Sequence, residues 1–159
     1  MSRLHSAAVA VAALLAMPTM AHAQSKDTRF GPVSIERNVL MFRGRPVVPS
    51  VESDVNLLLD EVVQVGSYDA VVVANSQGGN GCPVMWQVVT VTAQGARSTP
   101  PFGTCSEGAD VSRKGDGVSL RMHAYSTLAR DRAGLGGDRR DNVFIVRNGV
   151  VTDNGKPVH

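Results

Sequence analysis

The chain has 159 residues, of which 43% are hydrophobic, and a formal net charge of +2. This length is enough for one domain around one core, and the near balance of acidic and basic side chains argues against a nucleic-acid-binding surface. Aromatic residues make up only 4% of the chain, so the core must consist mainly of valine, leucine, isoleucine and methionine.

Residues 1–23 are predicted to be a secretory signal peptide. Arg3 provides the basic start, a short apolar segment follows, and Ala21-His22-Ala23 fits the small-residue cleavage pattern. The apolar segment is too short to span a bilayer well, and no later segment is long enough. We therefore expect cleavage after Ala23 and an exported mature chain, residues 24–159, in the periplasm or outside the cell.

The mature chain is predicted to be mainly β, as a single small domain of antiparallel strands and hairpins with one or two short helices. Runs rich in β-branched or alternating apolar residues, separated by Gly, Asn and Pro, predict strands at 33–36, 39–42, 46–49, 68–75, 84–92 and 118–125. Both faces of 84–92 are largely apolar, which indicates a central strand covered on both sides. In 118–125 every second residue is apolar and should face the core. The polar residues 24–29 are expected to form a frayed terminus.

Two segments are candidates for helices. Residues 54–65 have apolar side chains at helical spacing behind Ser53, a residue type that caps helices, but they also contain enough valine for a strand. We favour the strand because the neighbouring segments are strands. Residues 126–133, which precede three glycines, are the stronger helix candidate.

The two ends of the mature chain share a sequence pattern. Residues 33–47 align with 143–158, with one gap at Gly149, in the frame V-x-I-x-R-N-(G)-V-x-x-x-x-G-[RK]-P-V. Each copy predicts three short strands, and Asn148-Gly149 and Asn154-Gly155 are typical of type I′ hairpin turns. A duplicated unit with two binding edges is one interpretation. We favour a structural role, and predict that the two hairpins pack side by side to close the domain.

The two cysteines, Cys82 and Cys105, are predicted to form a disulfide. An exported chain with two cysteines favours this, and the absence of a CxxC pair or of histidines at ligand spacing makes a zinc site a poor fit. Free or metal-bound thiols are the alternative. The bond would join the turn before the strand 84–92 to the segment Phe102-Gly-Thr-Cys105. We expect no cofactor and no metal.

Ser76 lies in the segment A-N-S-Q-G, which resembles the G-x-S-x-G nucleophile elbow of serine hydrolases. The elbow needs a helix after the serine, whereas here a glycine-rich turn leads into another valine-rich strand. A catalytic pair of Ser76 and His123, oriented by Asp110 or Asp116, is therefore the alternative to a purely structural turn, which we favour. His123 lies on the polar face of its strand and is expected at the surface.

Four short motifs resemble a family of small exported bacterial proteins that has no assigned activity. They are F-R-G-R-P-V-V-P, G-G-N-G-C-P, P-F-G-T-C-S and N-G-K-P-V, which begin at Phe42, Gly78, Pro101 and Asn154. The resemblance covers most of the mature chain. It implies export to the periplasm and a bond between Cys82 and Cys105, and it brings no activity, cofactor or catalytic residue with it.

On these grounds we expect an exported, non-catalytic protein that binds another periplasmic protein or an envelope component. The export signal, the small size and the disulfide favour this function, and no catalytic constellation is convincing. A small serine hydrolase that uses Ser76 is the alternative. We expect neither a nucleic-acid partner nor a membrane span in the mature chain, and the sequence leaves the oligomeric state open.

Overall fold

The computed structural model describes residues 24–79, 81–124 and 141–158, and every regular element in these ranges is a β-strand. The strands form three antiparallel sheets that follow one another along the chain. The mainly β fold in a single small domain is therefore confirmed. Residues 126–133, the stronger helix candidate, lie outside the described residues.

The N-terminal sheet contains, in order, β1 (Ser25–Thr28), β2 (Gly31–Glu36), β3 (Val39–Phe42) and β4 (Arg45–Pro46). The central sheet contains β5 (Asn56–Val65), β6 (Tyr68–Ser76), β7 (Val84–Thr92) and β8 (Gly95–Ser98). The C-terminal sheet contains β9 (Asp110–Lys114), β10 (Gly117–Met122), β11 (Asn142–Arg147), β12 (Val150–Asp153) and β13 (Lys156–Pro157), again with sequential neighbours paired.

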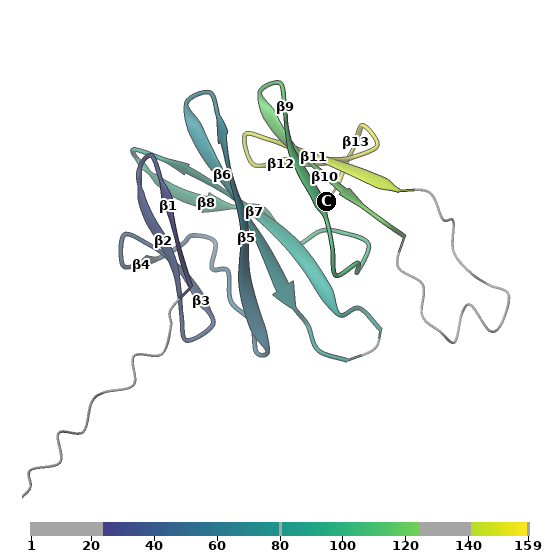
Figure 1. The fold of residues 1–159 in the computed structure, drawn as a ribbon, viewed down its shortest axis with the longest axis horizontal. Coiled ribbons are helices and arrows are strands. Elements are labelled where there is room, and N and C mark those ends of the chain that lie inside the picture. The colour runs from purple at the N-terminus through teal and green to yellow at the C-terminus, as the bar shows by residue number, and fades with distance from the viewer. Residues whose placement is uncertain (1–23, 80, 125–140, 159) are drawn as a thin grey trace, which may run out of the picture.

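The sheets stack as three layers, with the central sheet between the other two (Figure 1). One core cluster, between the central and N-terminal sheets, includes Leu40, Val71 and Val89. The other, between the central and C-terminal sheets, includes Val72, Trp86 and Leu120. Successive residues of a strand point to opposite faces, so β6 and β7 must be apolar on both faces to serve both clusters. The predicted central strand at 84–92 is thus confirmed.

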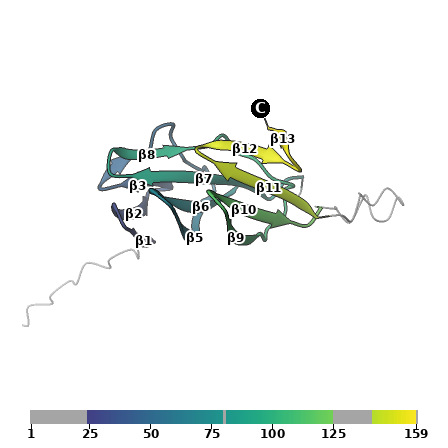
Figure 2. The same cartoon turned by 90° about the horizontal axis from the view of Figure 1, so that it is seen from above.

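Three of the edge strands, β1, β5 and β9, lie on one side of the stack. The edge strands β8 and β13, together with β12, lie on the other side (Figures 1 and 2). The long edge strand β5 lies in the segment 54–65, which was a candidate for either a strand or a helix. The favoured strand is confirmed. Its first residues alternate between exposed and buried, as expected for a strand with one face on the core, until a bulge between Leu59 and Glu61 shifts the register.

The prediction of a frayed terminus is wrong, because residues 24–29 are ordered by pairing and hydrogen bonds. Ser25–Thr28 pair with β2, and Gln24 and Lys26 reach the edge of β5 at its bulge. The Gln24 Oε1 accepts the N–H of Leu59 at 3.1 Å, and the Lys26 Nζ donates to the carbonyl of Asp60 at 2.7 Å. The segment carries no apolar stripe, so its order comes from tertiary hydrogen bonds that local composition does not reveal.

Each end of the described chain forms the same three-stranded unit, β2-β3-β4 and β11-β12-β13. The N–H of Arg43 donates to Pro32 at 3.1 Å, and the N–H of Asn154 donates to Val143 at 3.1 Å. The two units therefore correspond without a gap, with Val47 matching Val158. This corrects the gapped sequence alignment.

The sequence alignment was wrong because it matched the Arg-Asn dipeptides of the two units. In the structure these dipeptides occupy positions that differ by one residue. Arg37-Asn38 forms the first turn of one unit, whereas Asn148-Gly149 forms it in the other, and Arg147 still belongs to β11. All four turn residues have positive φ, as a two-residue type I′ turn requires. A one-residue slip exchanges the two faces of a strand, so the corrected register matters. It matches Val33 with Phe144, and both are buried.

The prediction that the two hairpins pack side by side is wrong. The first unit belongs to the N-terminal sheet and the second to the C-terminal sheet, and each packs on a different face of the central sheet. The physical reason is that β6 and β7 present two apolar faces, and each face needs its own cover. The repeated unit supplies part of both covers.

Candidate functional site

The predicted disulfide between Cys82 and Cys105 is present, with the two Cα atoms 4.7 Å apart. It joins the loop before β7 to the segment that follows Phe102, as expected. On this segment Phe102 pairs with Trp86 through two backbone hydrogen bonds of 2.8 Å, and the indole N–H of Trp86 donates to the carbonyl of Ser106. The bond therefore holds a chain segment that already lies against β7.

Ser76 ends β6, and the residues after it form a turn that leads directly into β7. Gly78 and Gly79 have positive φ, and the N–H of Gln77 donates to the carbonyl of Pro83 at 2.9 Å, closing the loop. No helix follows Ser76 in the described residues, so the strand–turn–helix geometry of an elbow is missing there. The half-buried Ser76 accepts a hydrogen bond from the Ser53 hydroxyl through its backbone carbonyl.

His123 follows β10 in the C-terminal sheet, and its side chain is 81% exposed, as expected for a surface histidine. Its Nδ1 lies 2.6 Å from a carboxylate oxygen of Asp141, a partner that the sequence analysis did not single out. Within the described ranges no hydrogen bond joins His123 to Ser76: Ser76 ends a strand of the central sheet, whereas His123 follows a strand of the C-terminal sheet.

Asp110 and Asp116 were the candidate orienting carboxylates, and among the described residues neither forms a hydrogen bond with His123. Asp110 begins β9 opposite Arg121. Asp116 lies in the β9–β10 turn, where it accepts a hydrogen bond of 2.7 Å from the Nε of Arg147. This hydrogen bond lowers the pKa of the Asp116 carboxyl below its usual value.

A buried polar cluster lies between the central sheet and the link that leads from the N-terminal sheet. Its members are Asn75, Gln87, Ser98 and Thr99. The side chain of Asn75 donates to the carbonyl of Glu52, and that of Ser98 donates to the carbonyl of Pro49. The side chain of Gln87 donates to the carbonyl of Thr99, and the hydroxyl of Thr99 accepts a backbone N–H of β7. These groups have protein partners, so the cluster fixes the link to the sheet rather than offering free donors to a ligand.

Three clefts follow one another along the side of the stack that carries β8. The first, of about 440 Å³, lies between the β3–β4 turn and the start of β8. The second, of about 350 Å³, is lined by the buried polar cluster together with Pro49, Pro100 and Pro101. The third, of about 290 Å³, shares both of the latter prolines and is bounded by β12. The clefts therefore span all three layers.

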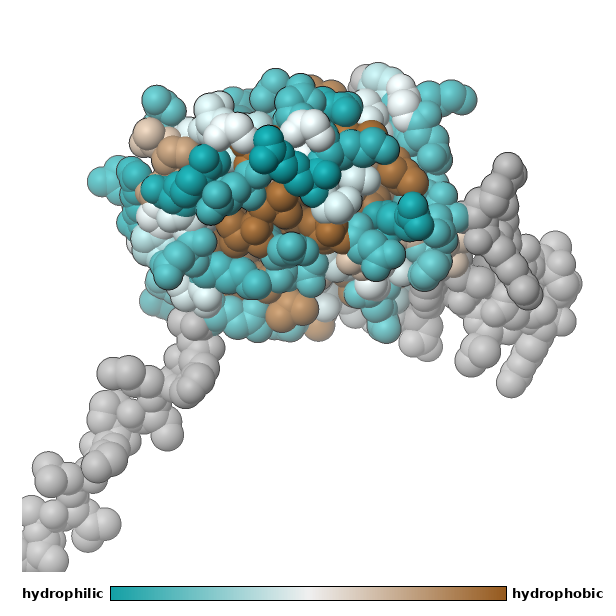
Figure 3. Space-filling view, turned by 45° about the horizontal axis from the view of Figure 1, so that its top comes forward, coloured by the Kyte–Doolittle hydropathy of each residue, from teal (hydrophilic) through white to brown (hydrophobic). Residues whose placement is uncertain are grey.

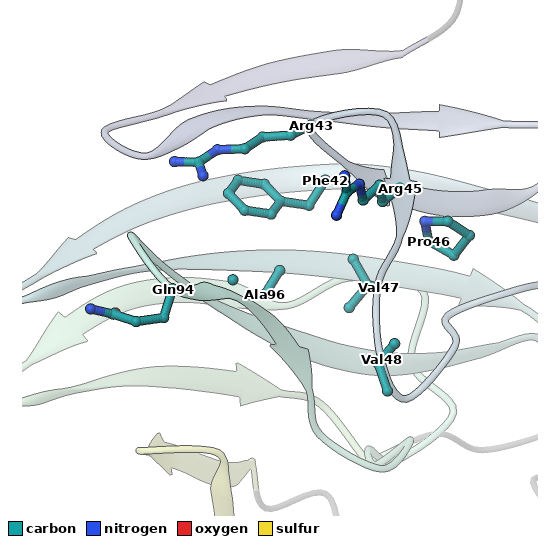
Figure 4. A pocket seen from close by; sticks show the side chains of 9 residues that line it. Phe42, Arg43, Arg45, Pro46, Val47, Val48, Gln94 and Ala96 are labelled. Atoms are coloured by element: carbon teal, nitrogen blue, oxygen red, sulfur yellow. The ribbon is translucent and has the colours of Figure 1, made fainter.

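The first cleft, which we call the arginine cleft, combines apolar and cationic side chains (Figure 4). Phe42, Val47 and Ala96 form its apolar part, and Gln94 and Ala96 come from the wall opposite the N-terminal sheet. Arg43 and Arg45 lie on either side of the Phe42 ring in Figure 4.

The two arginines of the cleft differ in how they are held. The Arg43 guanidinium stacks on the Phe42 ring, 4.9 Å from its centroid, and its Nε donates to the carbonyl of Phe30. Arg45 forms no ion pair or side-chain hydrogen bond with the described residues. No carboxylate of the described residues lines the cleft. The arrangement can therefore receive an anionic group beside an apolar one.

Some of the exposed hydrophobic side chains lie at the clefts. Figure 3 shows brown surface gathered in the middle of the face it presents, with teal side chains around it. The large apolar side chains that are exposed include Val48 beside the arginine cleft and Val150 beside the third cleft, at 72% and 58% exposure.

No group of three or more His, Cys, Asp or Glu side chains in the described ranges could hold a metal ion. Among the residues that the structure describes, there is also no helix long and apolar enough to cross a membrane. Comparison of the chain with protein-family models, curated proteins and solved structures found no match.

Proposed function

We propose that this chain is an exported, non-catalytic binding protein, and that its partner presents an acidic group next to an apolar one. The partner is another exported protein or an envelope component. The arginine cleft carries this proposal, because two arginines flank an aromatic ring there and none of its described lining residues is a carboxylate.

Two observations support export to the periplasm or the outside of the cell. Residues 1–23 have the basic start, the apolar segment and the cleavage pattern of a signal peptide. The disulfide between Cys82 and Cys105 fits an oxidising compartment, since disulfides are rare in the cytosol.

The chemistry of the arginine cleft supports binding of an acidic partner. Guanidinium groups form charge-assisted hydrogen bonds with carboxylates and phosphates. Arg43 is already oriented by its contacts with Phe42 and Phe30, so little rotamer entropy remains to be lost on binding. Arg45 contributes a charge that no described carboxylate neutralises. The apolar part of the cleft would cover the non-polar part of the same partner.

Photo-crosslinking and capture from the exported protein and envelope fraction tests this function. The bait is the exported chain, compared with Arg45→Glu, which reverses the charge that has no described partner. Lys114→Glu, at an exposed position next to the β9–β10 turn, is the matched control. We avoid Arg43 because its side chain also binds Phe30.

We expect a partner that is captured by the wild type and by Lys114→Glu but not by Arg45→Glu, and that is released by added salt. Identical captured species with all three baits would contradict binding at the arginine cleft. Mass spectrometry of the same exported chain checks the compartment, since its first residue should be Gln24.

A further inference from the structure

The outer edge of β3 in the first repeated unit is covered along its whole length. The N–H of Val47 donates to the carbonyl of Leu40 at 3.1 Å, which covers one end. At the other end the chain returns, and the N–H of Leu40 donates to the carbonyl of Val51 at 2.8 Å. The N–H of Ser53 then donates to the carbonyl of Asn38 at 3.1 Å. Val51 is only 1% exposed, so its side chain completes the core there.

Among the described residues, the second unit has only the first half of this cover. The N–H of Val158 donates to the carbonyl of Val151 at 3.0 Å, which repeats the bond from Val47 to Leu40. In an antiparallel hairpin, opposite residues alternate between pairs that bond to each other and pairs whose N–H and C=O point outward. The carbonyl of Val151 points outward, so its N–H does too. No described residue accepts that N–H, and none takes the place that Val51 has in the first unit.

An apolar groove lies at this vacant place. It is the third cleft described above, and β12 forms one side with Gly149, Val150 and Val151, while Pro100 to Phe102 and Val158 complete it. None of the described residues that line it is charged. Val150 is 58% exposed, whereas its counterpart Val39 is half-buried beside Glu52.

We propose that this groove binds an extended segment of a partner protein as an added β-strand. A β-branched apolar residue of the segment takes the position that Val51 occupies in the first unit, and its carbonyl accepts the N–H of Val151. Two residues later, an N–H of the segment donates to the carbonyl of Gly149, the counterpart of Asn38. Pairing of this kind is a known mode of peptide recognition at sheet edges.

Charge complementarity favours an acidic residue directly after the apolar one. In the first unit, Val39 pairs with Glu36 on one side and with Glu52 on the other, so the three residues form one row across the strands. In the second unit Arg147 replaces Glu36 and faces Val150. Arg147 also binds Asp116, but its side chain remains 43% exposed. An acidic residue in the row beside Val150 would therefore share that row with the cation Arg147, whereas Glu52 shares its row with the acidic Glu36.

The segment that fills the first unit provides the probe, a blocked peptide of sequence P-S-V-E-S-D, as in residues 49–54. It is titrated into the ¹⁵N-labelled exported chain, purified from cells that express the full-length sequence. We expect saturable amide shifts at Val151 and Gly149 and slower hydrogen exchange of the Val151 N–H. Val158→Asp should weaken binding by about tenfold or more, because it places a carboxylate at the groove.

Val55→Asp, an exposed valine outside the groove, is the matched control and should bind like the wild type. Peptides with aspartate in place of the valine, or lysine in place of the glutamate, should bind more weakly. Equal binding of all peptides, or the absence of saturable shifts at Val151, would overturn the proposal. Shifts at Val151 that appear on concentrating the chain without peptide would assign the groove to a second copy and overturn it as well.

This inference goes beyond the proposed function, since the groove and the arginine cleft are lined by different residues. Arg45→Glu should leave peptide binding unchanged, and Val158→Asp should leave capture at the arginine cleft unchanged. A failure of either proposal can therefore be read separately from the other.

Discussion

At the scale of single residues, the most deeply buried charge in the described chain is Asp69, which is fully inaccessible in β6. Arg29 neutralises it, with its backbone N–H and its Nε at 2.6 and 2.7 Å from the two carboxylate oxygens. The same guanidinium donates to the carbonyls of Gly66 and Tyr68. A buried carboxylate is tolerated only when it is paired and hydrogen-bonded, and both conditions hold here. The pair ties the segment between β1 and β2 to the central sheet.

Replacing Asp69 by alanine should destabilise the fold strongly. The substitution removes the acceptor of two hydrogen bonds from Arg29, and a hydrogen bond to a charged group contributes about 1.5 to 3 kcal/mol. Urea unfolding followed by tryptophan fluorescence measures the loss, since Trp86 lies in the core. Asp27→Ala, at an exposed position in β1, is the control. Equal unfolding midpoints for the two variants would contradict this role of Asp69.

The carboxyl of Asp116 should make stability depend on pH in the acid range. Its pKa is lowered in the folded chain by the hydrogen bond from Arg147, so its contribution is present above the unfolded value of 3.8 and is lost as pH falls through the folded value. Asp60 has the opposite sign, because burial raises its pKa despite the nearby Lys26. A comparison with Asp116→Asn isolates the first group from the second.

Thermal unfolding midpoints of the wild type and Asp116→Asn, measured between about pH 7 and about pH 2, test this sign. The wild type should be more stable at neutral pH, and the difference should shrink as the solution becomes more acidic than the folded pKa. A difference that grows toward acid would contradict the assignment. Asp54→Asn, for which no ion pair is recorded among the described residues, controls for the loss of one carboxylate.

At the scale of elements, strands with a strong apolar pattern were predictable and polar ones were not. β6, β7 and β10 were expected from their valine-rich or alternating runs, and all three are present. β1 and β9 are polar edge strands, and no local pattern distinguishes them from loops. These strands form because of contacts with residues elsewhere in the chain, such as the hydrogen bonds that join Gln24 and Lys26 to β5.

The candidate sites, too, could be predicted where a local sequence pattern exists and could not be predicted where they depend on contacts between distant segments. The disulfide could be predicted from two cysteines behind a predicted export signal, and the turn at Ser76 from its glycines. The arginine cleft could not, because Gln94 and Ala96 come to face Arg43 and Arg45 only when the outer sheet is packed on the central one. The groove at β12 required the correct register of the second unit, which the shared Arg-Asn dipeptide concealed.

The disulfide should contribute measurably to the stability of the central sheet. Cys82 and Cys105 are separated by 23 residues. In the chain-entropy model, opening a loop of this length costs about 3.5 kcal/mol of stability. Urea unfolding of the wild type with and without reductant measures this cost, and the double variant Cys82→Ala and Cys105→Ala should reproduce it. A reduced chain as stable as the oxidised one would contradict the prediction.

At the scale of the whole molecule, the fold is a central sheet whose two apolar faces are covered by two sheets that contain the same three-stranded unit. Composition predicted the β class, but the layer order depends on which face of β6 and β7 each outer sheet covers, and both faces are similarly apolar. The two outer sheets are not equivalent in their surroundings. The first unit borders the arginine cleft, and the second borders the uncovered edge of β12.

The central functional claim is that the arginine cleft selects an anionic group with an apolar neighbour. A pair of small probes that differ in charge, octanoate and octylamine, tests it on the ¹⁵N-labelled exported chain. The account predicts saturable amide shifts at Val47, Gly95 and Ala96 with octanoate, weaker shifts in Arg45→Glu, and none at these positions with octylamine. Equal shifts with both probes, or no saturable shift at these three amides with octanoate, would contradict it.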